Sequence, residues 1–124
     1  MSTLKVNNIG KTSGSTQDTM EGLGKVWVNF NGTGTIATRD SHNVSGLTDH
    51  STGRYTIAYS SNMNNANYAN VVGQEFKDGG NYAHRMHNDP DTAQTTSNVK
   101  MMHRSEAAYA DNEYLFTCVM GDLA

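Results

Sequence analysis

The chain has few of the residues that cross-link, stiffen or charge a protein. Its 124 residues include one cysteine, one proline and one tryptophan, and charged residues make up only 17%. A single cysteine permits no internal disulfide. No run approaches the roughly 18 apolar residues of a membrane-spanning helix, and the N-terminus lacks the apolar segment of a signal peptide. These absences predict a soluble protein, made in a cytoplasm and without membrane insertion.

Positive charge is also scarce. Nine Lys and Arg residues stand against twelve Asp and Glu residues, the net charge is -3, and no stretch of the chain groups its basic residues. A protein that follows a nucleic-acid backbone carries Lys and Arg in a patch or stripe. The sequence therefore predicts no nucleic-acid partner.

Small polar residues are abundant instead. Asn and Thr occur fourteen times each and Gly twelve times. A helical bundle would be rich in Ala, Leu, Glu and Lys, whereas Thr-rich strands joined by Gly and Asn turns have this composition. Asn31 and Gly32 form the dipeptide that most strongly signals a hairpin. Strands are expected at residues 25–30, 35–41, 42–49, 54–60, 68–76, 82–87, 97–104 and 113–121.

About eight short strands at this spacing predict an all-β fold, an antiparallel β-sandwich or a barrel-like module. In the first strand Val26, Val28 and Phe30 share one face, with Trp27 on the other. The last strand, residues 113–121, is apolar on both faces, which predicts a central strand or one buried between subunits. The other strands have a thin apolar face, and so small a core favours oligomerisation.

The chain divides into an N-terminal arm, residues 1–24, and a β domain, residues 25–124. In the arm Leu4, Val6 and Ile9 form an apolar pattern among polar residues, and a Gly/Ser-rich stretch follows. Residues 15–21 could form a single helical turn. A lone strand cannot bury its own face, so this assembly arm is expected to pair with a sheet edge of another copy or of a neighbouring protein.

No constellation of residues indicates catalysis or a metal site. His84 and His87 lie three residues apart, which in a strand directs them to opposite faces. Cys118 falls in an alternating apolar strand and is interpreted as a small hydrophobe of the core. Asp89 and Asp91 lack the spacing of a calcium loop and are interpreted as part of a turn. The sequence therefore predicts no enzyme, no cofactor, no metal and no catalytic residue.

A carbohydrate-binding surface is a further hypothesis, because aromatic rings beside Asn side chains can stack on and hydrogen-bond sugars. The alternative is that these rings pack in a second core or in a subunit interface. The aromatic candidates are Trp27, Tyr68, Tyr82 and Tyr109. The candidate ligand contacts, for a host glycan, are Asn64, Asn65, Tyr82 and Asn88.

Several motifs appear in order along residues 24–73. They are W-V-N-F-[ND]-G-x-G-T at 27–35, R-x-S-x-N-V-S-x-[IL]-T-D at 39–49, G-x-Y-T at 53–56 and M-x-x-A-N-Y at 63–68. In this order they resemble a module of tail-fibre and related virion proteins of marine tailed phages of the cyanophage and pelagiphage type. The stretch STLKVNNIGKTSG is similar to a short unit that often precedes the module, whereas residues 74–124 match no such pattern.

This resemblance implies a virion structural protein made in the host cytoplasm, a short tail-fibre-like component or fibre tip. Its arm would attach it to other virion proteins, and its β domain, expected to be a homotrimer, would face outward for host attachment. The alternative is a capsid decoration, cement or head-fibre protein that stabilises the shell. A lyase or depolymerase is a further alternative, for which the sequence offers no catalytic constellation.

Overall fold

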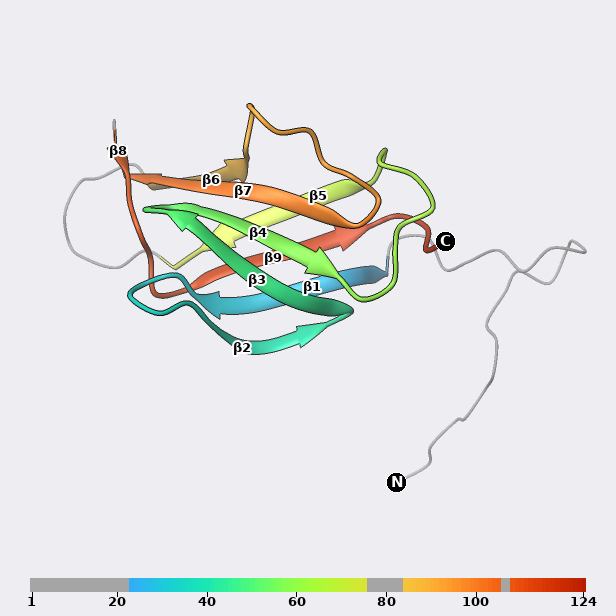
Figure 1. The fold of residues 1–124 in the computed structure, drawn as a ribbon, viewed down its shortest axis with the longest axis horizontal. Helices are drawn as coiled ribbons and strands as arrows, with labels where there is room; N and C mark the ends of the chain where they lie inside the picture. Colours follow the sequence, from blue (N-terminus) through green and yellow to red (C-terminus); the bar gives the residue numbers. More distant parts are fainter. Residues whose placement is uncertain (1–22, 76–83, 106–107) are drawn as a thin grey trace, which may run out of the picture.

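The computed structural model forms an all-β structure of two antiparallel sheets (Figure 1). It describes residues 23–75, 84–105 and 108–124. The predicted arm, with Leu4, Val6, Ile9 and the helical turn, lies outside these residues, as does Tyr82. Within the described ranges, no helix is long and apolar enough to cross a membrane.

One sheet has four strands and the other has five. The four-stranded sheet has the order β2-β1-β9-β5, with β1 Gly24–Asn31, β2 Ala37–His42, β5 Ala69–Gln74 and β9 Leu115–Met120. The five-stranded sheet has the order β3-β4-β7-β6, and β8 also pairs with β7. Its strands are β3 Val44–Ser51, β4 Arg54–Tyr59, β6 His84–Asn88, β7 Asn98–Ser105 and β8 Ala108–Tyr109. The prediction of an antiparallel all-β sandwich is confirmed, and each expected strand overlaps an observed one. The two-residue β8 was not expected.

The chain passes from the first sheet to the second at Asn43, between β2 and β3. This residue has a φ of 56°, in the left-handed region that Asn tolerates better than most residues. Its side chain binds the backbone of Ser61 as a neighbouring strand would. Oδ1 accepts a hydrogen bond from the Ser61 backbone amide at 2.7 Å, and Nδ2 donates to the Ser61 carbonyl at 3.1 Å. The turn at Asn43 therefore lets the consecutive strands β2 and β3 belong to different sheets.

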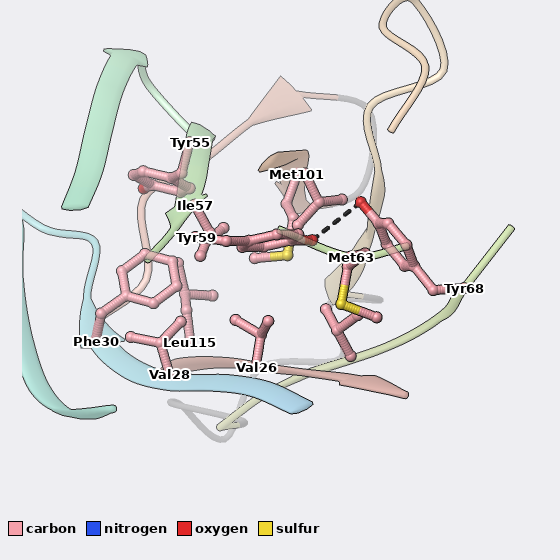
Figure 2. Packing of buried hydrophobic residues seen from close by; sticks show 12 residues of the cluster. Val26, Val28, Phe30, Tyr55, Ile57, Tyr59, Met63, Tyr68, Met101 and Leu115 are labelled. Atoms are coloured by element: carbon pink, nitrogen blue, oxygen red, sulfur yellow. Dashed lines mark hydrogen bonds between the residues drawn. The ribbon is translucent and has the colours of Figure 1, made fainter. Parts of the chain in front are cut away.

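The core lies between the sheets, and strand alternation supplies it (Figure 2). As predicted, β1 buries Val26, Val28 and Phe30. The alternate residues Tyr55, Ile57 and Tyr59 of β4 face them across the core. The Phe30 and Tyr55 rings meet edge to face, with centroids 5.3 Å apart. The buried apolar cluster consists of Val26, Val28, Phe30, Tyr55, Ile57, Tyr59, Met63, Tyr68, Val99, Met101, Leu115 and Val119.

The last strand is central, as its sequence predicted. β9 pairs with β1 on one side and with β5 on the other. Its inward face buries Leu115, Thr117 and Val119, and the Thr117 hydroxyl is satisfied by donating to the Asn70 side chain. Its outward face includes Cys118, which is partly exposed. The interpretation of Cys118 as a core residue was wrong, because on a strand apolar on both faces alternation cannot tell which face is inside.

Candidate interaction face

The outward face of the four-stranded sheet is apolar at its centre. Strand register places Trp27 of β1 opposite Cys118 of β9, and Cys118 opposite Val71 of β5. In the next row of the same sheet Phe116 lies opposite Gly73. Val71 is 50% exposed and Phe116 is 45% exposed. We call this surface the interaction face; it consists of Trp27, Val71, Phe116, Cys118 and Met120.

Phe116 is held in place by the glycine opposite it. A Cβ atom added at Gly73 would lie 2.1 Å from the Cζ of Phe116, so the ring occupies the space above the bare backbone. β5 is an edge strand, and an aromatic ring over an edge glycine is a known way to shield its backbone. One side of the ring therefore packs on β5, while nearly half of the side chain remains accessible to solvent.

Polar groups border this face. Arg39 of β2 lies over the Tyr114 ring, with its Cζ 4.1 Å from the centroid. Its Nη1 also donates a hydrogen bond to the Glu113 carbonyl at 2.6 Å. An apolar centre with a polar margin is the usual anatomy of a protein interface. By contrast, the outward positions of the other sheet include Thr48, Thr56 and Lys100.

The candidate carbohydrate-binding residues differ in how many hydrogen bonds they form within the protein. Asn88 Oδ1 accepts a hydrogen bond from Asn70 at 2.5 Å, and its amide nitrogen donates to Gln94 at 3.2 Å. Gln94 in turn donates to the carbonyls of Ala66 and Tyr68 at 2.7 and 2.9 Å. This chain of amides joins Asn88 to the loop that contains the other two Asn candidates.

Asn64 and Asn65 lie exposed in that loop. The side chain of Asn65 accepts a hydrogen bond from the backbone N–H of Asn67 at 2.8 Å. The backbone N–H of Asn64 donates to the Asp122 carbonyl at 2.8 Å. The structure thus brings Asn88 and this loop together through Gln94. Tyr82 lies outside the described residues.

Tyr68, considered above as an exposed sugar platform, is a core residue. It is 7% exposed, and its hydroxyl accepts a hydrogen bond from the Tyr59 hydroxyl at 3.0 Å. It also donates toward the Thr95 and Asn98 carbonyls, at 2.9 and 3.1 Å. Burial raises the pKa of both phenols. The alternative reading of this ring, as part of a core, is therefore the correct one.

The acidic pair forms the expected turn. The Asp91 amide donates to Asp89 Oδ1 at 3.0 Å, and the Thr92 amide donates to the Asp89 carbonyl at 3.3 Å. Arg54 Nη2 lies 3.1 Å from Asp89 Oδ2 and 3.0 Å from Asp91 Oδ2. Within the described part of the chain, no group of three or more His, Cys, Asp and Glu side chains is placed to hold a metal ion.

The sequence indicated the β9 part of the interaction face but not the β5 part. The two apolar faces of residues 113–121 pointed to a buried outer surface, but nothing local linked them to Val71 and Gly73. The missing signal was strand order, because β5 lies more than forty residues before β9 in the chain and only their pairing aligns the two.

Neither a scan of protein-family models nor searches of curated proteins and of solved structures found a match to this chain. Proposals about its function rest on the motifs of the sequence and on the geometry of its sheet faces.

Proposed function

We propose that this chain is a structural protein of a tailed-phage virion, a short tail-fibre-like component or fibre tip that assembles as a homotrimer. The motifs at residues 27–68 support the virion assignment. One observation of the fold carries the assembly: a contiguous apolar patch on the outer face of one sheet, which in a monomer faces water. Surfaces of this kind mark sites of association.

The partner that best fits the interaction face is a second copy of the chain. Leu23, 50% exposed, leads directly into Gly24, where an added Cβ would lie 2.8 Å from Cys118 Sγ. The arm therefore joins the β domain beside the interaction face. Copies that associate through this face bring their arms together, so that the arms can pair with one another or attach jointly to a neighbouring virion protein.

The oligomeric state of the full chain tests this proposal. Light scattering and native mass spectrometry at micromolar concentration are expected to find a trimer. Replacing Val71 and Phe116 together by Ser should dissociate it. Leu123→Ser is the matched control, because it also removes an exposed apolar side chain (39% exposed) but lies outside the interaction face. A well-folded monomer in the unmodified chain would contradict the proposal.

The attachment role of the arm is tested on particles. Deletion of residues 2–14 should leave the β domain folded and abolish incorporation into virions. Normal incorporation of the shortened chain would contradict this role. Particles that lack the protein and lose resistance to heat or osmotic shock, while still adsorbing to the host, would instead identify a capsid cement or head-decoration protein.

A further inference from the structure

The strand order leaves four of the longer strands at the edges of the two sheets, β2 and β5 in one sheet and β3 and β6 in the other. An edge strand has unpaired backbone groups, and proteins usually protect it with charged side chains or with a bulge. β2 has Arg39 and Asp40, and its register with β1 shifts beside them. β3 has Asp49 and two register shifts, and β6 has Arg85.

β5 lacks both kinds of protection. Its residues Ala69–Gln74 include no charged side chain and no proline, and they pair with β9 without a register shift. Val71, near its centre, is 50% exposed. Among the strands that the structure describes, β5 is therefore the edge best suited to accept a further strand.

One hydrogen bond at the end of β5 shows which backbone groups face its free side. The backbone N–H of Glu75 donates to the Tyr114 carbonyl at 3.0 Å, so these two residues form a hydrogen-bonded pair. Along an antiparallel ladder such pairs alternate with pairs that exchange no backbone hydrogen bonds. Counting back from Glu75, Gly73 and Val71 therefore bond to β9. The residues between them direct their N–H and C=O groups to the free edge; they are Asn70, Val72 and Gln74.

The N-terminal arm joins the β domain at the end of the sheet where β5 begins. Gly24 of β1 pairs with Met120 of β9, and Met120 pairs with Ala69, the first residue of β5. Adjacent strands are about 4.8 Å apart, so a strand added beyond β5 would lie roughly 14 Å from β1. The thirteen residues 10–22 can span up to about 43 Å when extended. This length is enough for residues 3–9 to reach the β5 edge of an adjacent copy.

Symmetry favours the arm over a second β5 strand as the occupant of this edge. Two β5 edges that pair with each other are related by a two-fold axis, which closes a dimer. A cyclic trimer instead requires two different surfaces of each copy in every contact. The arm and the β5 edge are two such surfaces. Val71 belongs both to β5 and to the interaction face, so an added strand would continue the proposed subunit contact.

The residue pattern of the arm matches a strand at this position. Leu4 and Val6 share one face, and polar residues alternate with them. Val72 of β5 and Met86 of β6 are partly buried against the core, on the side of the sandwich where β5 and β6 contact each other. An added strand with Leu4 and Val6 facing inward would cover these two side chains and extend the core.

We propose that residues 3–9 of one copy add to the β5 edge of the next copy as a further strand, so that three arms and three edges close a ring. Backbone hydrogen bonds along the free edge hold the arm, and its two apolar residues determine which face turns inward. The inference names the partner of the arm within the homotrimer, and it rests on that proposed assembly.

Amide hydrogen exchange of the full-length chain, followed by NMR, tests the pairing residue by residue. The added strand should protect the amides of Val72 and Gln74, whose N–H groups face the free edge. Replacing Leu4 and Val6 together by Ser should speed exchange at Val72 about tenfold or more. Exchange at Val71 is the control within the same strand and should stay unchanged, because its N–H bonds to β9 in both proteins.

Cross-linking between copies identifies whose arm is bound. In a Cys118→Ser background, one sample carries Asn7→Cys and another carries Ala69→Cys, and the two are mixed, unfolded and refolded together. A short bismaleimide should join the two kinds of chain, and the link must lie between copies because neither chain has both cysteines. Ala37→Cys is the matched control, since Ala37 is also an exposed alanine that begins an edge strand of the same sheet, β2. It should not be linked to Asn7→Cys.

Light scattering on the same samples separates this inference from the proposed assembly. A trimer in which the Leu4 and Val6 double variant leaves exchange at Val72 unchanged, or in which Asn7→Cys links equally to both edges, contradicts only the inference. Protection of Val72 without links between copies would overturn it too, because each arm would then bind its own β5. A dimer with both signals would support the arm exchange and contradict only the trimer, and a monomer would contradict both.

Discussion

The hydroxyl of Tyr55 joins three segments at one end of the sandwich, and its removal is the sharpest test of how the fold is held together. Tyr55 is fully buried, and its Oη lies 2.9 Å from the Gly32 carbonyl and 2.8 Å from Asp111 Oδ1. The same carboxylate oxygen accepts a hydrogen bond from the Gly53 amide at 2.7 Å. The hydroxyl thus connects the turn after β1, the β3–β4 turn and the segment before β9.

Tyr55→Phe keeps the ring, its burial and its edge-to-face contact with Phe30, so the change removes only the hydroxyl. A hydrogen bond to a charged group contributes about 1.5–3 kcal/mol to stability. Because Asp111 is exposed, water can replace the lost donor there, and the expected loss is about 1–2 kcal/mol. For a domain of this size that corresponds to a melting temperature lower by roughly 4–8 °C for each kcal/mol.

The assay is urea unfolding of Tyr55→Phe, Asp111→Asn and the double variant at one protein concentration, since association changes apparent stability. The two changes should be non-additive by at least about 0.5 kcal/mol. Tyr114→Phe, in an exposed ring, is the control and should change stability little. A loss below about 0.5 kcal/mol for Tyr55→Phe, or strict additivity with Asp111→Asn, would refute the reasoning.

Three further predictions concern the same sandwich. Burial raises the pKa of Tyr55 and Tyr59. Their contribution to folding stability is therefore complete below a pH of about 10, the ordinary pKa of a tyrosine. The free energy of unfolding should fall as the pH rises beyond this value, which circular dichroism can follow. Gly53 and Gly34 both have positive φ, but an added Cβ at Gly53 would lie 2.5 Å from a backbone carbonyl and one at Gly34 meets nothing. Gly34→Ala should lower the free energy of unfolding by about 1 kcal/mol, and Gly53→Ala should lower it by at least about 1 kcal/mol more, as measured by denaturant titration. Asp89→Asn should cost about 2 kcal/mol in the same titration, because the carboxylate is buried between two cationic partners.

Local pattern was sufficient to predict most strands because their two faces differ sharply. In β4 every second residue is large and apolar and the residues between are not, so the strand has one possible inner face. In β1 only Trp27 departs from this alternation, and the three apolar residues Val26, Val28 and Phe30 still define the inner face. The pattern failed at Cys118, where both faces are apolar, and at Tyr68, where a phenol looks equally suited to a surface or a core. Tyr68 is buried because the Tyr59 hydroxyl and the carbonyls of Thr95 and Asn98 complete its hydrogen bonds, and the two carbonyls lie 27 and 30 residues further along the chain.

The candidate surfaces depended on pairings that no local pattern contains. Arg54, Arg85 and Arg104 are far apart in the sequence, and the absence of a basic run correctly described the chain but not its surface. The arginines are on one face because each occupies an outward position of strands that become neighbours only in the order β4-β7-β6. Alternation could have assigned each to an outer face, but only strand order places them side by side.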